Sequence, residues 1–290
     1  MRVLLAADGS NDSRLATRWL QQFAPTADIE PTVLTVATLT EPPRDSRTMR
    51  QLRESVVIEA RHAVERAAKV LRPRWPEVKT LVIEGDPRVE IVRAAEDLRA
   101  DMLALGARGV GRLKRLLVGS TSLAAARYAP CPVAIVRGRA RPVRRAVVAV
   151  DGSEGSRAAV RFLSLFDLVR EARVSLLHVL QAATRPGRRR SIASLPDQQT
   201  GNERRTPQAD VEKMLTDAAG VLGAGRYPIE RLVADGDPGR QIVSIASSRN
   251  VDLIVLGARG LRTLGRLLLG SVSETVLHHA GRPVVIVRER

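Results

Sequence analysis

The chain contains 290 residues with a mass of 31.6 kDa, which is enough for two domains of ordinary size. Hydrophobic residues make up 44% of the sequence and charged residues 27%, and the longest apolar runs are far shorter than the ~18 residues that a membrane span requires. The single cysteine, Cys131, excludes an intrachain disulfide and a cysteine-based metal site. The N-terminal segment reaches Asp8 before the apolar core of a signal peptide could form, so we expect a cytoplasmic protein without a membrane segment.

Basic residues outnumber acidic ones by 47 to 31, which gives a net charge of +16 and a pI near 11.4. Such a balance raises nucleic acid as a partner. However, residues 1–141 hold 24 basic and 16 acidic residues, and residues 142–290 hold 23 and 15, so neither half carries a dedicated basic arm. The seven aromatic residues offer few rings on which bases could stack. An arginine-rich solvated surface is therefore favoured, and nucleic-acid binding is kept as a minor alternative.

In chain order, short β-branched runs alternate with stretches of helical period. The first part of the chain predicts strands at residues 2–7, 31–37, 79–83, 101–105 and 133–136, with helices at 11–23, 48–71, 87–98 and 121–128 between them. Strands joined by helices of this length favour right-handed crossovers and a parallel sheet covered on both faces.

The rest of the chain repeats this pattern. The segment Asp8–Ser10, which follows the first strand, returns as Asp151–Ser153, and Asp101–Ser120 returns as Asp252–Ser271. The offset grows from 143 to 151 residues, so the second copy holds eight extra residues within Gln181–Pro207, whose composition predicts a basic surface loop. We therefore predict an α/β fold of two tandem doubly wound parallel five-stranded sheets, in domains spanning residues 1–141 and 142–290.

Ligands of open parallel sheets bind beyond the carboxyl ends of the strands, where the winding direction reverses. Asp8 and Asp151 follow the first strand of each copy. Each carboxylate is placed to accept hydrogen bonds from a ribose or an adenine, or simply begins a turn.

A glycine pattern follows the fourth strand of each copy. Gly106 is followed by Gly109 after two residues, and Gly109 by Gly119-Ser120 after nine; the same spacing recurs after the equivalent strand of the second copy. Glycines let the backbone approach a ligand closely and allow positive φ, and the Gly-Ser pair opens a helix whose N–H groups favour a phosphate. In the second copy, Ser271–Glu274 also fits a capping box. The alternative is that these glycines only permit tight packing between the loop and the sheet.

This spacing, together with a first strand that ends in Asp-Gly-Ser, resembles the ATP-binding branch of the universal stress protein family. The resemblance covers nearly all of both halves and implies the fold of adenine nucleotide α-hydrolases, with ATP and its Mg²⁺ bound in both halves. The residues that it assigns to the nucleotide are Asp8, Val36, Gly106, Arg108, Gly109, Gly119, Ser120, Thr121 and Ser122 in the first half, and Asp151, Val179, Gly257, Arg259, Gly260, Gly270, Ser271, Val272 and Ser273 in the second.

The last strands, Val133–Val136 and Val284–Val287, are short apolar runs that begin after a proline. An exposed edge of this kind invites pairing with another strand. The resemblance implies that these strands pair with each other, so that the two halves pack as a pseudo-dimer within the chain. A covered inner strand within one sheet is the alternative.

The expected function is an ATP-binding module of the stress response that acts on an unknown protein partner, and a homodimer of the tandem chain stays open. The charge of a bound triphosphate is expected to pull inward the nine-residue loops Val110–Val118 and Leu261–Leu269, which carry arginines and a lysine. The chain lacks the Gly-x4-Gly-Lys run of P-loop enzymes and a Gly-x-Gly-x-x-Gly run after either first strand. A slow ATPase that uses the same site is the alternative, and no catalytic or metal-binding residue is assigned.

Overall fold

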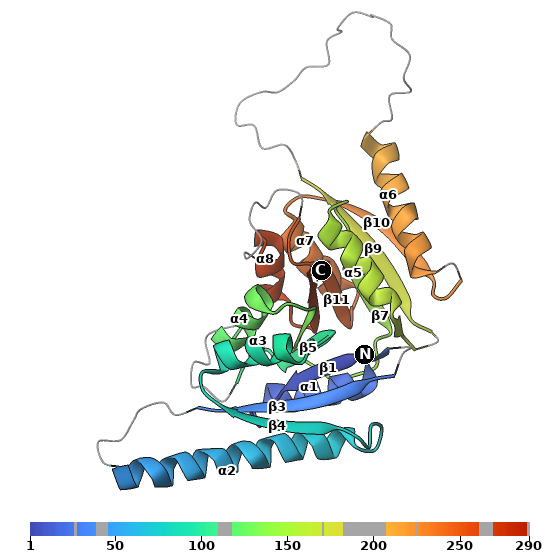
Figure 1. Cartoon of the computed structure of the whole chain (residues 1–290). Coiled ribbons are helices and arrows are strands. Elements are labelled where there is room, and N and C mark those ends of the chain that lie inside the picture. Colours follow the sequence, from blue (N-terminus) through green and yellow to red (C-terminus); the bar gives the residue numbers. More distant parts are fainter. Residues whose placement is uncertain are drawn as a thin grey trace, which may run out of the picture.

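The computed structural model describes residues 1–25, 28–38, 46–109, 118–169, 171–181, 207–223, 225–260 and 269–288. The first half (blue to green in Figure 1) holds β1 (Arg2–Ala6), α1 (Asn11–Gln22), β2 (Ala24–Pro25), β3 (Glu30–Ala37), α2 (Ser46–Leu71), β4 (Lys79–Glu84), α3 (Pro87–Asp97), β5 (Met102–Gly106), α4 (Ser120–Tyr128) and β6 (Val133–Val136). The second half holds β7 (Arg145–Ala149), α5 (Glu154–Ser164), β8 (Phe166–Asp167), β9 (Arg173–Leu180), α6 (Pro207–Leu222), β10 (Ile229–Asp235), α7 (Pro238–Ser248), β11 (Leu253–Gly257), α8 (Ser271–His279) and β12 (Val284–Val287). The predicted strands and helices of the first half are all present, with boundaries within two residues.

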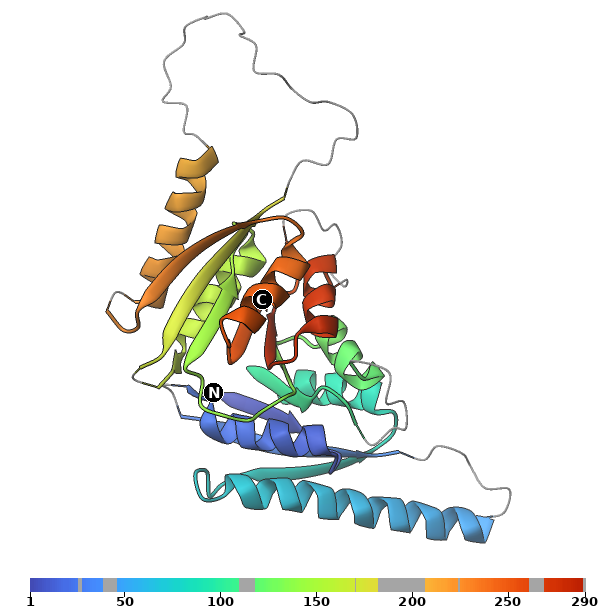
Figure 2. The ribbon, with the colours of Figure 1, turned by 180° about the vertical axis from the view of Figure 1, so that it is seen from behind.

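One continuous sheet runs through the whole described chain, in the order β10-β9-β7-β11-β12-β6-β5-β1-β3-β4. All pairs within each half are parallel, whereas β12 and β6 pair antiparallel, with Val284 opposite Ile135 and Ile286 opposite Val133. The doubly wound fold is therefore confirmed twice, and the two predicted five-stranded sheets are joined through their last strands. The view from behind (Figure 2) shows the two halves side by side.

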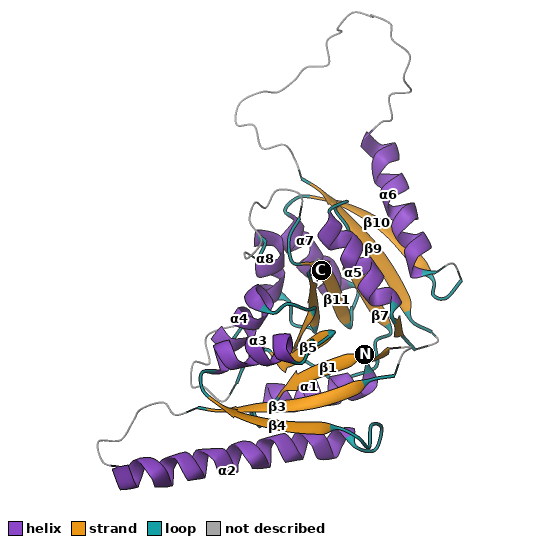
Figure 3. Ribbon diagram, viewed as in Figure 1, coloured by secondary structure: helices purple, strands orange, loops and turns teal. Residues whose placement is uncertain are grey.

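Helices cover both faces of this sheet (Figure 3). One hydrophobic cluster contains buried residues of α1, α2, α5 and α6, and another contains those of α3, α4, α7 and α8. Side-chain caps start several of these helices: Ser10 caps α1 and Ser153 caps α5, while Asp86 and Asp237 cap α3 and α7, each followed by a proline in the first turn. Such caps satisfy N–H groups that the helix itself leaves unpaired.

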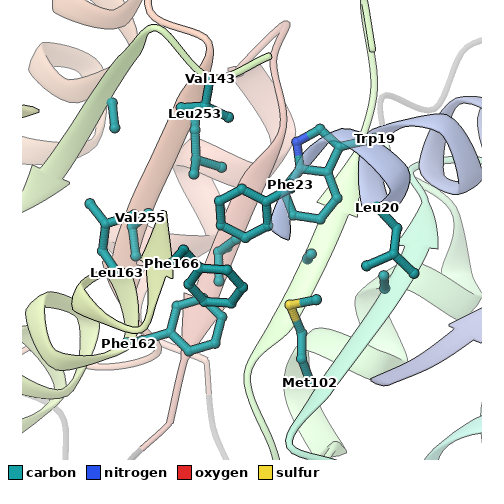
Figure 4. Packing of buried hydrophobic residues seen from close by; sticks show 14 of the residues in the cluster. Trp19, Leu20, Phe23, Met102, Val143, Phe162, Leu163, Phe166, Leu253 and Val255 are labelled. Atoms are coloured by element: carbon teal, nitrogen blue, oxygen red, sulfur yellow. The ribbon is translucent and has the colours of Figure 1, made fainter. Parts of the chain in front are cut away.

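An aromatic stack joins the two halves on the α1 and α5 face of the sheet (Figure 4). Phe23 stacks on Trp19 with ring centroids 4.5 Å apart and on Phe166 of the other half at 4.2 Å. Phe162 tilts against Phe166 at 4.8 Å. Beside the stack, β2 and β8 pair antiparallel across the halves, with Pro25 opposite Phe166. This two-stranded sheet was not predicted from the sequence.

Within the described part of the chain, every helix is too short or too polar to cross a membrane. Cys131 is buried among apolar neighbours of the α3 and α4 cluster, as its small, weakly polar side chain favours.

Candidate functional site

The first turn after β1 brings an aspartate to the carboxyl edge of the sheet. Asp8 Oδ1 accepts the N–H of Ser10 at 2.9 Å, and Gly9 has a φ of +77°, which a glycine adopts without strain. Ser10 Oγ accepts the N–H of Ser13 at 3.1 Å and donates to the carbonyl oxygen of Arg108 at 3.2 Å. The cap of α1 therefore ties the Asp8 turn to the glycine loop that follows β5.

The glycines of that loop serve close approach. A Cβ on Gly109 would lie 2.6 Å from Oδ2 of Asp8, and one on Gly106 would lie 2.5 Å from the backbone carbon of Asp12. Neither glycine is among those with positive φ, so the sequence-based argument from positive φ does not apply to them. Gly106, the last residue of β5, allows α1 to pack closely against the strand, while Gly109 places the loop directly against the aspartate.

The helix α4 begins beside this loop. Gly119 occupies the cap position, and its helix start has no hydrogen bond from a side-chain cap. The Gly119 N–H donates to the Ala107 carbonyl at 2.8 Å, and the buried hydroxyl of Ser122 donates to the Gly106 carbonyl at 2.8 Å. Ser120 is exposed and Thr121 is half-buried, so these two hydroxyls are placed nearer to solvent than that of Ser122, which anchors the loop.

The second half repeats these contacts. Ser153 N–H donates to Asp151 Oδ1 at 3.0 Å, and a Cβ on Gly260 would lie 2.5 Å from Asp151 Oδ2. The Gly270 N–H donates to the Ala258 carbonyl at 2.8 Å, and Ser273 donates to the Gly257 carbonyl at 2.7 Å, as in the first half. Ser271 is exposed and Val272 is half-buried. The predicted site residues that follow the first and fourth strands therefore meet in both halves.

The capping box that was predicted for Ser271–Glu274 is wrong. Gly270 takes the cap position of α8, so Ser271 lies within the helix, and no side chain caps its start. Glu274 instead accepts a hydrogen bond from Arg127 of the first half at 2.8 Å.

The predicted adenine contacts lie at the ends of the second long strand of each half. Val36 pairs with Ile83 in the β3–β4 register and Val179 pairs with Ala234 in the β9–β10 register, and both valines are half-buried. Both pack against the cluster that contains Ala107 and Val118 on the α3 and α4 face. These valines thus line the same carboxyl edge of the sheet as the two aspartates, on a neighbouring strand.

Each valine follows a polar residue that the sequence did not point out. The Thr35 hydroxyl donates to the Ala7 carbonyl, and in the second half a ring nitrogen of His178 lies 2.8 Å from the Val150 carbonyl. These contacts hold the end of the second long strand against the turn that carries the aspartate. The offset of 143 residues that relates Asp8 to Asp151 also relates Thr35 to His178, and this was the signal in the sequence that could have found them.

An arginine outside the predicted set acts electrostatically on each predicted loop arginine: Arg137 on Arg108, and Arg288 on Arg259. Arg108 Nε lies 3.2 Å from Oδ2 of the largely buried Asp12. Burial lowers the pKa of Arg137, the Arg108 charge lowers it further, and Asp12 opposes the shift. In the second half, burial and then the Arg259 charge lower the pKa of Arg288. Two guanidinium groups therefore lie within electrostatic range of each other at each loop.

Arg137 and Arg288 also form hydrogen bonds between the two halves. Arg137 donates to the Ala280 carbonyl at the end of α8 at 2.9 Å, and Arg288 donates to the Ala126 carbonyl of α4 at 2.9 Å. Cations suit the carbonyl ends of helices. Each candidate site is thus linked to the last helix of the opposite half.

Parts of the predicted site lie outside the described residues. These are residues 110–117 and 261–268, which contain Arg112, Lys114, Arg115, Arg262 and Arg266, and residues 182–206 of the basic loop. Val118 and Leu269, which end the two glycine loops, are described and are buried.

The fold and the paired loops define a tandem α/β protein with one candidate ligand site in each half. Comparison with known proteins agrees with this description: the chain belongs to the universal stress protein family, whose model matches residues 1–137 and 142–288.

Relatives of this chain share its tandem length. It is 29% identical to a universal stress protein of Mycolicibacterium smegmatis, over 99% of this chain and 97% of the relative, and 29% identical to one of Mycobacterium tuberculosis, over 99% and 96%. A universal stress protein of Archaeoglobus fulgidus superposes with a TM-score of 0.68 at 23% identity, covering 99% of this chain and 96% of that structure. The structural likeness supports the fold.

Proposed function

We propose that this protein binds ATP in each half and acts as a nucleotide-dependent regulatory module of the stress response. One observation carries the proposal: both halves bring an aspartate, a glycine loop in contact with it and an uncapped helix start to the same edge of the sheet. The contact between Asp8 and Gly109 is the same as that between Asp151 and Gly260, although the equivalent residues lie about half the chain apart in sequence.

The helix starts suit a phosphate group. The helices α1, α3, α5 and α7 have side-chain caps, whereas α4 and α8 begin at a glycine without one. Because the first N–H groups of a helix carry partial positive charge, an anion at α4 or α8 would supply the partners that a side chain supplies elsewhere.

The nucleoside end fits the other side of each loop. A carboxylate at Asp8 or Asp151 accepts hydrogen bonds from ribose hydroxyls, and the half-buried Val36 and Val179 offer apolar surface to the adenine ring. The glycines keep this space clear, since a larger residue at Gly109 would reach the Asp8 carboxylate. We assign the predicted site residues of both halves to these roles, with Ser122 and Ser273 as anchors of the loops.

Mg²⁺ would enter with the triphosphate, since this ion is held mainly by phosphate oxygens and water. Among the described residues, no cluster of three potential ligands is present that would hold the ion without the nucleotide. We place the domains at residues 1–141 and 142–290, and the protein in the cytoplasm, where ATP would report energy status to a protein partner.

The test is equilibrium dialysis of the full chain against labelled ATP with Mg²⁺. Gly109→Val should abolish binding in the first half and Gly260→Val binding in the second, and the double variant should bind none. Gly220→Ala is the matched control, because a Cβ there meets no atom within 4 Å. Full ATP binding by a correctly folded double variant would contradict the proposed site.

A further inference from the structure

One difference between the two candidate sites, among the residues that the structure describes, is a carboxylate beside the glycine loop. Asp12 is the second residue of α1, two positions after the Ser10 cap, and it is 8% exposed. The equivalent position of α5, two residues after the Ser153 cap, is Gly155. The surrounding backbone is the same, because a Cβ on Gly106 would meet the Asp12 backbone at 2.5 Å and one on Gly257 would meet that of Gly155 at 2.6 Å.

The Asp12 carboxylate lies at the glycine loop. Its Oδ2 is 3.2 Å from Nε of Arg108, which stands between the two loop glycines. Its charge also acts on Arg137. Burial and the Arg108 charge lower the pKa of Arg137, whereas Asp12 raises it. The first site therefore combines two guanidinium groups with a carboxylate that pairs with Arg108 and acts electrostatically on Arg137.

The second site has the two guanidinium groups in the same places. Arg259 takes the position of Arg108, and burial together with the Arg259 charge lowers the pKa of Arg288. The acidic residue that α5 does carry near its start is Glu154, whose carboxylate is held by Arg157 at 2.9 Å and by Arg161 along the exposed surface of the helix. At the position of Asp12, the buried Gly155 supplies no carboxylate to the second loop.

We propose that Asp12 sets the two halves apart in their preference for phosphate charge, so that the second half binds ATP more tightly than the first. The inference rests on the proposed nucleotide site. Because the difference is one of charge, it grows with the charge of the ligand: it is largest for ATP, smaller for AMP and absent for adenosine.

Two reciprocal substitutions test this. In the Gly260→Val background, which leaves the first site, Asp12→Asn should tighten ATP binding by about tenfold, or ~1.4 kcal/mol, without changing adenosine binding. In the Gly109→Val background, which leaves the second site, Gly155→Asp should weaken ATP binding by a similar factor. Gly155→Asn is the control of similar size and should keep most of the ATP affinity. Higher salt should reduce both effects.

The outcomes separate this inference from the proposed function. Equal ATP affinity in the two halves, with no response to Asp12→Asn or Gly155→Asp, would overturn the inference and leave the nucleotide site standing. Weaker ATP binding in folded Asp12→Asn would overturn it as well, since Asp12 would then act by positioning Arg108. Absence of binding for ATP and adenosine in the wild-type chain would overturn both. Circular dichroism shows which variants are folded.

Discussion

A Cβ atom on Gly109 would lie 2.6 Å from Oδ2 of Asp8, whereas one on Gly106 would lie 2.5 Å from backbone atoms of α1. The two glycines of one motif thus have different structural roles. A collision with a carboxylate is relieved by rotating that side chain, while a collision with helix backbone requires the helix to move.

Gly106→Ala should therefore destabilise the fold more than Gly109→Ala. Overpacking against a backbone that cannot yield costs ~1–3 kcal/mol, and α1 would be pushed from β5. Thermal unfolding of the two variants measures the difference. Equal melting temperatures for both variants and the wild type would show that α1 has room to shift, contrary to the contact described here.

Ser122→Ala should loosen the first glycine loop. The buried hydroxyl donates to the carbonyls of Gly106 and Ala107, and its removal leaves part of that hydrogen bonding unmet, at a cost of ~1–2 kcal/mol. We expect a lower melting temperature and faster amide hydrogen exchange around Gly119. Ser120→Ala, at an exposed position of the same helix, is the matched variant and should keep the wild-type stability.

Phe166→Ala should weaken the junction between the halves. This fully buried ring contacts Phe23 of the first half and Phe162 of its own, and removal of a buried aromatic side chain typically costs ~3–5 kcal/mol. Denaturant unfolding followed by tryptophan fluorescence, in a Trp75→Phe background that leaves Trp19, reports on the same stack. Val233→Ala, at a residue that is 53% exposed, should change the unfolding midpoint little, and an equal loss in both variants would contradict the role of the stack.

Asp86 should make a small pH-dependent contribution to stability. The Arg88 side chain and then its backbone N–H lower the pKa of Asp86. The folded-state pKa lies below the unfolded one, so the contribution is complete above pH ~4 and is lost as the pH falls through the folded-state pKa. Asp86→Asn keeps a good helix cap without the charge.

The melting temperature of Asp86→Asn should lie ~1–2 °C below that of the wild type at pH 7, with the gap closing near pH 3, since an exposed ion pair contributes little. A gap that stays constant between these two pH values would assign the effect to the cap alone.

The sequence predicted the fold well because each half records it independently. The alternation of strands and helices, the glycine spacing and the apolar last strands all recur, and the β6–β12 pairing confirms what the edge at Val133–Val136 indicated. The short strands at Ala24–Pro25 and Phe166–Asp167 were not predicted because each is only two residues long. Each pairs only with the other, which lies in the opposite half.

The site was predicted less completely, for a physical reason. Glycine spacing marks the backbone path, but side-chain partners depend on how distant segments meet. Asp12 and Arg108 are separated by 96 residues, and no local pattern relates them. The prediction of a capping box was wrong for a related reason. Ser271–Glu274 has the right residues, but Gly270 takes the cap position one residue earlier, and Glu274 accepts a hydrogen bond from Arg127 of the other half.

The central claim is that each half holds ATP. The most direct measurement is the amount of ATP bound per chain at saturation, by equilibrium dialysis of the wild type, Gly109→Val, Gly260→Val and the double variant with Mg²⁺. The account predicts one nucleotide for each intact loop: two for the wild type, one for each single variant and none for the double variant. Absence of bound nucleotide in the folded wild type at millimolar ATP would contradict it.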